Sequence, residues 1–320
     1  MRSFHKRKII SSDKLEKFYQ SINSVTNEIN NELKLINNKN DKKKFLKKFG
    51  HLRPSTYSIS SKNYKENFKN YFSKSENEIL KIKNFNLDKI LINKINLIFK
   101  KNHLKTNYKK FINFATDAIR LREYSKLIFT KCIDEIFNNL ISLGNEFKIG
   151  RDDLEHISIK SILKFYNNVE SGFKLKKQFK KEINENKKNF NILKLLEYPD
   201  FIKDKNDIFF HTIKKNKGNY ITTKKVNGPL IEFSKVKNYN NLSSKILLLK
   251  NADPGYDFIF SKNIIGLITE YGGANSHMSI RCLELGIPAI IGIGSKDFNF
   301  LKNKKNIEID ALQKTFKILN

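Results

Sequence analysis

The sequence has few cysteines and no arrangement of them that indicates a disulfide framework or a metal site. Only 2 of 320 residues are cysteine. Cys132 and Cys282 lie far apart and outside any CxxC spacing, so a reducing, cytoplasmic environment is the simplest interpretation. No apolar run approaches the roughly 20 residues of a membrane-spanning helix. The basic start MRSFHKRKIISSDK lacks the apolar segment of a secretory signal. We therefore expect a cytoplasmic protein with no metal ligands and no membrane partner.

Acidic residues are also scarce, with 32 Asp and Glu against 62 Lys and Arg, a formal net charge of +30. Such a charge attracts anions, including nucleic acids. The lysines are spread along the whole chain beside abundant Asn and Ile, a bias expected of an AT-rich genome, and no nucleic-acid motif with aromatics at defined spacing is present. We do not expect a nucleic acid as the main partner, although phosphate-bearing substrates would be attracted.

The chain is long enough for two domains, and its hydrophobic content of 39% favours a folded protein. In the first two-thirds, apolar residues recur every three or four positions, which predicts helices. One continuous stripe covers residues 15–36, with Asp13 and Glu16 resembling a capping box at its start. Further helices are predicted over residues 87–98, 108–143, 158–166 and 173–196, with a stop at Gly144 and a turn at residues 150–153.

Residues 200–220 are polar and weakly patterned, with one possible short strand at residues 208–212. We therefore predict an α+β multidomain protein: an all-α helical domain at residues 1–200, a flexible linker at 201–219 and a compact α/β domain at 220–320. Strands are predicted at residues 220–226, 230–233, 245–249, 307–309 and 315–318, with a turn at 227–229 and a short helix from residue 253.

The most informative stretch, residues 266–294, reads GLITEYGGANSHMSIRCLELGIPAIIGIG. Residues 267–269 predict a buried strand, two glycines break it, and Ser276 is a plausible N-cap that places His277 in the first turn of a helix. Gly286 and a following proline end that helix before a second buried strand at residues 289–293.

This pattern suits phosphoryl transfer. A neutral imidazole is a nucleophile near pH 7, and a phosphoryl group on His277 would lie at the positive end of the helix that follows. We expect an exposed ring, with room beside the flanking glycines. Gly272, Gly273, Asn275 and Ser276 are the candidate phosphate-binding residues. Glu270 is a second catalytic candidate, which could orient the imidazole or accept its proton; a salt bridge at the strand end explains it equally well.

Three segments, DPGYDFIF at 253–260, GLITEYGGANSH at 266–277 and ELGIPAIIG at 284–292, closely resemble the phosphohistidine swivelling domain of phosphoenolpyruvate synthases, pyruvate phosphate dikinase and rifampicin phosphotransferase. The resemblance implies that His277 carries the phosphoryl group. Asn275 stands where many members have Thr, and Leu283 stands where many have a phosphate-clamping Arg. Arg281 lies two residues earlier, about 200° around the helix, and is a candidate for the same task.

Two further segments resemble the helical region that precedes this domain in the same family. One is the loop GHLRPSTY at residues 50–57, whose His and Arg suit an anionic substrate. The other is REYSK at residues 122–126. By this resemblance His51, Arg53 and Arg122 are candidates for binding the acceptor, whereas a structural turn with a paired arginine is the alternative for the loop.

A GxxxxGK[ST] loop is absent, and so is a recognisable ATP-grasp domain or phosphoenolpyruvate-binding barrel. The resemblance therefore implies a phosphotransferase component that binds no cofactor itself. We expect Mg and ATP on a separate ATP-grasp partner protein, and a small molecule as the phosphoryl acceptor. Two alternatives stay open: a non-catalytic regulatory or scaffold remnant of such an enzyme, and a basic nucleic-acid-binding protein.

Overall fold

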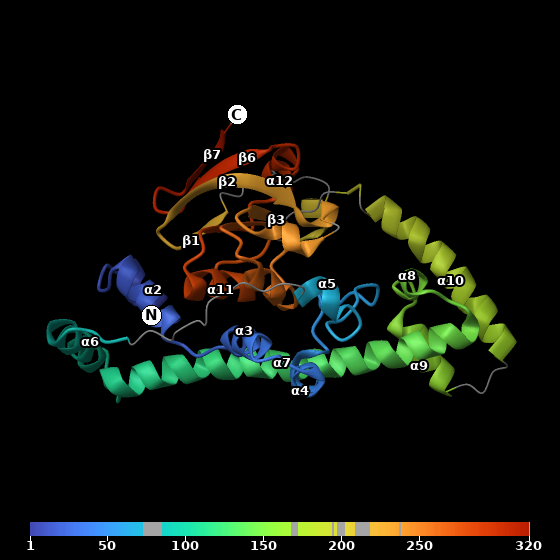
Figure 1. The fold of residues 1–320 in the computed structure, drawn as a ribbon, viewed down its shortest axis with the longest axis horizontal. Coiled ribbons are helices and arrows are strands. Elements are labelled where there is room, and N and C mark those ends of the chain that lie inside the picture. Colours follow the sequence, from blue (N-terminus) through green and yellow to red (C-terminus); the bar gives the residue numbers. More distant parts are fainter. Residues whose placement is uncertain are drawn as a thin grey trace. The chain divides into compact units, whose positions relative to one another are not determined.

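The computed structural model of the chain describes residues 1–72, 85–167, 172–193, 195–196, 202–208, 218–236 and 238–319. It has an N-terminal helical part and a C-terminal mixed sheet (Figure 1), so the predicted α+β class is confirmed. The predicted linker lies mostly outside the described residues, as does most of the strand predicted at 208–212.

Helices make up most of the first two hundred residues, as the apolar periodicity predicts. Their bounds are α1 Arg2–Lys6, α2 Ser12–Gln20, α3 Val25–Lys34, α4 Lys39–Phe49, α5 Phe68–Phe72, α6 Lys89–Lys101, α7 Tyr108–Phe147, α8 Arg151–Leu154, α9 Ile159–Asn167 and α10 Gly172–Leu193.

The predicted stripe over residues 15–36 is not one helix but two, α2 and α3. Side chains compete with the helical backbone at the break: Ser21 Oγ donates to the Phe18 carbonyl, and Asn27 Nδ2 donates to the Ile22 carbonyl. The N-cap also differs from the prediction, since Ser11 Oγ accepts the Lys14 amide. An unbroken apolar spacing therefore does not exclude a sharp turn.

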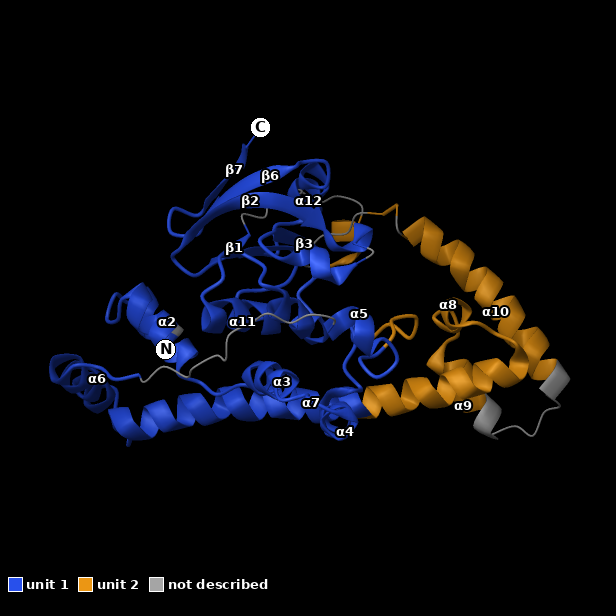
Figure 2. Cartoon of the chain, in the orientation of Figure 1, with its two compact units in different colours: residues 1–56, 63–131, 216–320 blue, residues 57–62, 132–215 orange. Residues whose placement is uncertain are grey.

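Contacts divide the chain into two compact units (Figure 2). Unit 1 comprises residues 1–56, 63–131 and 216–320, and unit 2 comprises residues 57–62 and 132–215. Unit 2 contains the C-terminal part of α7 with α8, α9 and α10, and a small core of Ile149, Phe179 and Ile183. The stop predicted at Gly144 is wrong, because α7 continues through it to Phe147. This glycine serves close packing instead: an added Cβ would lie 2.9 Å from both the Ile149 oxygen and Leu154 Cδ1.

Unit 1 contains a seven-stranded sheet in the order β1-β5-β4-β3-β2-β6-β7. Strands β2, β3, β4 and β5 pair in parallel, whereas β1, β6 and β7 pair antiparallel with their neighbours. The bounds are β1 Asn219–Ile221, β2 Lys225–Glu232, β3 Ile246–Asn251, β4 Gly266–Tyr271, β5 Ala289–Ile291, β6 Asn306–Asp310 and β7 Thr315–Leu319.

The turn predicted at residues 227–229 is wrong, because β2 runs straight through it. Residues 225–229 of β2 pair with β6, and from Leu230 onward the strand pairs with β3. Pro229 stands where β2 changes partner, a position at which the missing N–H of proline is tolerated. The Gly-Pro pair therefore marks a switch of partner within one strand.

The two faces of the sheet are covered by different helices (Figure 1). Ile246, Leu248 and Ile268 face α12 (Ser295–Leu301), whereas the alternate residues Leu247 and Leu267 face α11 (His277–Leu285). On the α11 side the apolar core continues without a break into α2, α3, α4 and α5. The 3-10 helix η4 (Pro254–Lys262) contributes to this shared core, so the sheet and helices α2–α5 belong to one compact unit. The remaining short 3-10 segments are η1 Lys205–Ile208, η2 Phe233–Lys235 and η3 Tyr239–Leu242.

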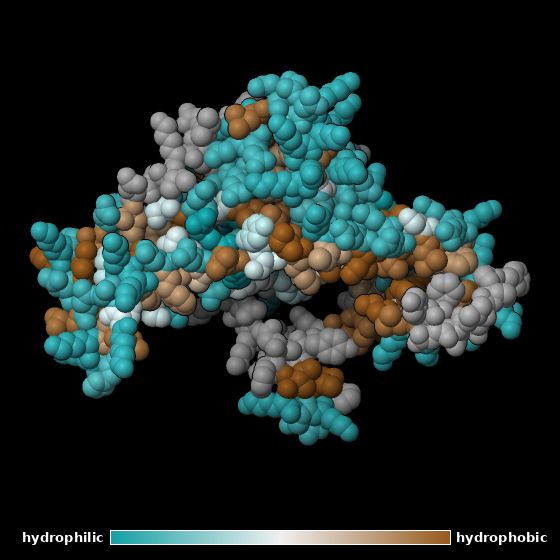
Figure 3. Space-filling model, turned by 90° about the horizontal axis from the view of Figure 1, so that it is seen from below, coloured by the Kyte–Doolittle hydropathy of each residue, from teal (hydrophilic) through white to brown (hydrophobic). Residues whose placement is uncertain are grey.

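Helix α7 also carries large apolar side chains that are exposed. Phe114 is 70% exposed and Leu121 63% exposed, and Figure 3 shows brown side chains among teal ones on the face where α7 lies. Within the described part of the chain, no helix is both long and apolar enough to cross a bilayer.

A substitution at Phe258 of η4 tests how much the shared core stabilises the protein. Its ring is fully buried, with its centroid 4.7 Å from that of Tyr71 and 5.3 Å from that of Tyr239. Phe258→Ala should lower the free energy of unfolding by about 3–5 kcal/mol through lost burial and cavity formation, as measured by urea denaturation followed by circular dichroism. The control, Phe300→Ala, removes a ring that is 52% exposed and should change stability little. Equal losses in the two variants would contradict this packing.

Candidate functional site

The predicted strand, glycine turn and helix around His277 are confirmed. β4 ends at Tyr271, and α11 begins at His277 with Ser276 as its N-cap, whose Oγ accepts the Ser279 amide at 3.3 Å. Gly286, at φ +65°, ends α11 in the left-handed conformation. His277 therefore lies in the first turn of a capped helix, at the positive end of its dipole.

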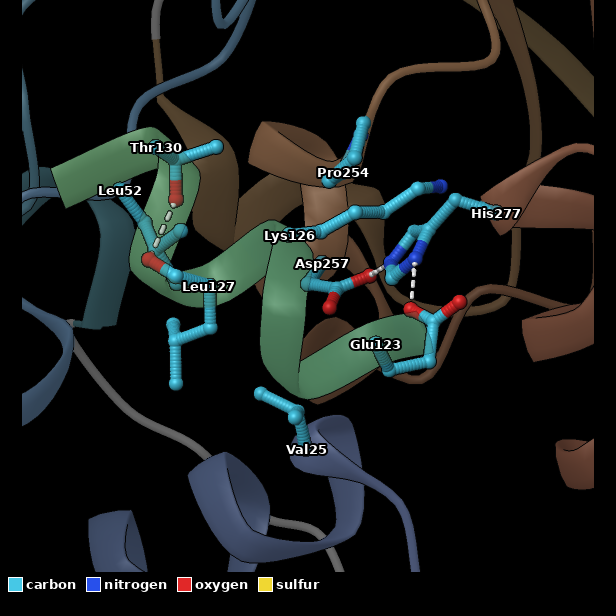
Figure 4. A pocket seen from close by; sticks show the side chains of 9 residues that line it. All are labelled: Val25, Leu52, Glu123, Lys126, Leu127, Thr130, Pro254, Asp257 and His277. Carbon is cyan, nitrogen blue, oxygen red and sulfur yellow. Dashed lines mark hydrogen bonds and ion pairs between the residues drawn. The ribbon is translucent and has the colours of Figure 1, made fainter. Parts of the chain in front are cut away.

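The expectation of an exposed ring is wrong for this structure, because two carboxylates enclose the imidazole. His277 is only 4% exposed. Its Nδ1 lies 2.5 Å from Glu123 Oε2 and its Nε2 lies 2.6 Å from Asp257 Oδ1 (Figure 4). Ionised carboxylates only accept hydrogen bonds, so this geometry favours a ring that donates from both nitrogens, an imidazolium. The surroundings are therefore charged rather than apolar.

The two carboxylates come from different parts of unit 1. Glu123 lies on α7, more than a hundred residues before the histidine, whereas Asp257 lies on η4, just before β4. Asp257 Oδ2 also accepts a 2.6 Å hydrogen bond from Thr26 Oγ1 on α3. We call Glu123 and Asp257 together the carboxylate clamp.

Arg281 completes the charged cluster one helical turn after His277. It is fully buried, and its guanidinium lies 3.5 Å from Glu123 Oε2, 3.8 Å from Asp257 Oδ2 and 2.5 Å from Glu284 Oε2. Its Nε is also 3.4 Å from His277 Nε2. This approach of two cations is offset by the carboxylates around them.

The pKa shifts follow from this arrangement. Burial lowers the pKa of His277, but the charge of Asp257 and the hydrogen bonds to both carboxylates outweigh burial and raise it above 6.5. Burial raises the pKa of Glu123, but the hydrogen bond and charge of His277, with Arg281, lower it to about 2. The pKa of Asp257 is lowered for the same reasons, against burial. All three pKa shifts favour ionised carboxylates and a protonated ring.

A small pocket adjoins the ring (Figure 4). Its free volume is about 20 Å³, enough for about one water molecule but not for a phosphoryl group with three oxygens. Lys126 of α7 also lines the pocket, and its side chain extends toward His277 (Figure 4). Burial lowers the pKa of Lys126, although the charge of Glu123 opposes this. The other lining residues are Val25, Leu52, Leu127, Thr130 and Pro254.

The residues predicted to bind phosphate lie at the start of α11. Gly272 has φ +137°, and an added Cβ would lie 2.7 Å from the Ala252 Cβ, whereas a Cβ at Gly273 would meet open space. The Asn275 carbonyl accepts a 3.2 Å hydrogen bond from Arg122 of α7. The structure thus brings together Asn275, predicted to bind phosphate, and Arg122, predicted to bind the acceptor.

Glu270 lies buried at the end of β4, where its carbonyl accepts the Gly294 amide at 3.1 Å. The structure places Glu123 and Asp257 against both ring nitrogens, so the role assigned to Glu270 stays a prediction.

The other two acceptor candidates are buried in the loop after α4. His51 Nε2 lies 3.0 Å from the Leu127 carbonyl of α7. The Arg53 carbonyl packs so tightly against Gly255 that an added Cβ there would lie 1.4 Å from it. The loop therefore connects α7 with η4, the elements that supply the clamp, and substrate binding by His51 and Arg53 stays a prediction.

Reasoning from the sequence missed Asp257 and did not rank Glu123 and Lys126 as site residues, although both belong to the REYSK segment. Asp257 had a usable signal. It stands between Tyr256 and Phe258 in an otherwise apolar run, and a carboxylate in such a setting needs a charged or hydrogen-bonding partner.

Comparison with known families supports the reading of this region. Residues 242–314 match the family model described as PEP-utilising enzyme, mobile domain. The match contains Asp257, His277 and Arg281, whereas Glu123 and Lys126 lie before it. A search of curated proteins found no match to the chain. The C-terminal part is thus similar to the mobile domains of PEP-utilising enzymes, as the resemblance implies.

The clamp predicts how stability depends on pH. Folding raises the pKa of His277 above its unfolded value near 6.5. The charged ring therefore contributes fully to the free energy of unfolding below that unfolded pKa, and this contribution is lost as the pH rises through the folded pKa. The stability difference between wild type and His277→Gln should therefore shrink as the pH rises above about 6.5. Urea unfolding at each pH measures it, with exposed His103→Gln as the control. A difference that is constant over this range would show that the ring is not charged in the folded state.

Proposed function

We propose that this chain is a phosphotransferase component in which His277 carries a phosphoryl group between a donor and an acceptor. The observation that carries the proposal is the position of this histidine: it begins α11 directly after the glycine turn, within the stretch that matches the mobile domain of PEP-utilising enzymes. Its two ring nitrogens each lie against a carboxylate oxygen.

The chemistry requires the ring to lose a proton first, because an imidazolium has no lone pair for attack. A neutral ring nitrogen then attacks phosphorus in line, the N–P bond forms and the P–O bond to the donor breaks. In the second transfer an acceptor oxygen displaces the ring nitrogen, and the hydroxyl proton replaces the phosphoryl group on the imidazole. Protonated His277 between two carboxylates is the state expected after the second transfer.

Each neighbouring residue has a role in this proposal. Asp257 orients the imidazole, and Arg281 offsets negative charge. Gly272, Gly273, Asn275 and Ser276 form the turn that receives the phosphoryl oxygens, with Glu270 behind it. Arg122 and Lys126 supply positive charge from the side of α7, where we place the acceptor together with His51 and Arg53.

The donor is expected on another protein. We propose ATP with Mg on an ATP-grasp partner, or phosphoenolpyruvate as the alternative donor, because the chain shows no nucleotide-binding motif of its own. The exposed apolar side chains of α7 support a protein partner, since such surfaces often mark interfaces. Residues 1–200, 201–219 and 220–320 as helical domain, linker and swivelling domain, and a cytoplasmic location, belong to the same proposal.

One observation favours the scaffold alternative. The ring is enclosed, and the adjoining pocket is too small for a phosphoryl group. A protein that had lost its activity could keep this closed arrangement permanently, whereas an active one must open it.

Labelling separates these two functions. With labelled ATP and an ATP-grasp protein encoded beside this gene, or with labelled phosphoenolpyruvate, the wild-type chain should acquire phosphate that is labile to acid and stable to alkali. His277→Ala should lose at least about 90% of that label, because only this residue carries it, and His103→Ala should keep it. Absence of label with every donor would favour the scaffold, and label that persists in His277→Ala would refute the assigned site.

A further inference from the structure

We propose that docking of α7 against His277 is an autoinhibitory contact: the closed clamp and the phosphorylated histidine exclude one another. The inference rests on the proposed function, since it concerns how the phosphoryl-carrying ring is controlled. The observation behind it is that both ring nitrogens are engaged by carboxylate oxygens at 2.5 and 2.6 Å.

The first argument is steric. A phosphoryl group bonded to either nitrogen would occupy the place of Glu123 Oε2 or of Asp257 Oδ1, since each oxygen lies directly on a ring N–H. The pocket beside the ring offers about 20 Å³, so the group has no other space. Phosphorylation therefore requires one carboxylate to move away.

The second argument is electrostatic. A phosphoryl dianion would face Glu123 from α7 and Asp257 from η4, whose oxygens lie 2.5 and 2.6 Å from the ring nitrogens, where like charges repel strongly. Glu284 of α11 adds a further carboxylate to the cluster through its contact with Arg281. Phosphorylation also replaces one N–H of the imidazolium by a negatively charged group, so one of the two carboxylates loses the donor that holds it at the ring. The cations in the cluster, Arg281 with Lys126 and Arg122 at its edge, are already shared among these carboxylates.

The two halves of the clamp differ in what they can do. Asp257 lies in the stretch that matches the mobile domain and so stays with the histidine, whereas Glu123 lies on α7, outside that stretch. Withdrawal of α7 would uncover Nδ1, remove one carboxylate and let the ring lose its extra proton. Glu123 is thus the residue of the clamp whose movement would free the imidazole ring.

Linkage makes the effect reciprocal. If the phosphoryl group lowers the equilibrium constant for closing the clamp by some factor, then closure lowers the equilibrium constant for phosphorylation by the same factor. An unphosphorylated chain is then held unreactive, and a phosphorylated chain is held open and ready for transfer.

Chemical phosphorylation tests the clamp without any partner. Phosphoramidate phosphorylates neutral, accessible imidazoles, and exposed His103 in the same chain provides the internal reference. In the wild type at pH 7 we expect His277 to react at least 10-fold more slowly than His103, and the two rates to become similar in urea. Glu123→Gln keeps the side-chain shape but removes the charge, so the His277 rate should rise at least 10-fold. The matched control, Glu135→Gln at an exposed position of α7, should leave that rate unchanged.

Site-resolved mass spectrometry under alkaline conditions measures these rates, with His277→Ala as the blank. Equal rates for His277 and His103 in the folded wild type would overturn the proposal, and so would an unchanged His277 rate in folded Glu123→Gln. The wild-type comparison stands even if that variant fails to fold. The outcome is also separable from the proposed function: a slow His277 that Glu123→Gln accelerates supports the clamp even where no enzymatic donor labels the chain.

Discussion

The arrangement of unit 1 depends on one buried cation held between two anions. His277 donates from Nδ1 to Glu123 and from Nε2 to Asp257, and Arg281 supports both acceptors from one turn further along α11. Breaking such a cluster by removing one member leaves an uncompensated buried charge, which is far more costly than the net value of the intact pairs. The cluster therefore contributes mainly by fixing which surface of the sheet domain faces α7.

Close packing and hydrogen bonds around the cluster fix the position of η4. Gly255 lets η4 approach the loop after α4, where an added Cβ would overlap the Arg53 carbonyl. The hydroxyl of Tyr64, from the segment that follows this loop, donates to the Gly255 carbonyl at 3.2 Å. Thr56 is bonded to Asp253 through both its amide and its hydroxyl. These contacts hold η4, and with it Asp257, whereas α7 reaches the ring through Glu123. Because α7 also contributes Leu127 to the shared apolar core, its withdrawal from the ring would break apolar contacts as well as the hydrogen bond from His277.

The sequence allowed the elements with strong local signals to be predicted. The helix at His277 follows from Ser276 and Gly286 as its caps, and the buried strands follow from their β-branched runs. Prediction failed where other contacts override local patterns. Gly228 and Pro229 lie inside a strand because β2 changes partner there. Helix α2 ends early, where the Ser21 hydroxyl donates to the Phe18 carbonyl. At the site, the local pattern predicted where His277 lies, but its two ring partners are 154 and 20 residues away. No spacing rule connects such distant residues.

The enclosure of the ring is compatible with a carrier role because of which residues enclose it. An apolar interior would keep the imidazole neutral and offer nothing that changes when a phosphoryl group arrives. A carboxylate clamp instead binds the imidazolium and repels the phosphorylated ring, so the chemical state of His277 itself determines whether the contact with α7 is favourable. Because Asp257 is part of the matched stretch and Glu123 is not, the interaction that senses this state lies at the contact between the sheet domain and α7. Under the proposed function, this property would keep the unphosphorylated ring docked against α7 and release the phosphorylated one.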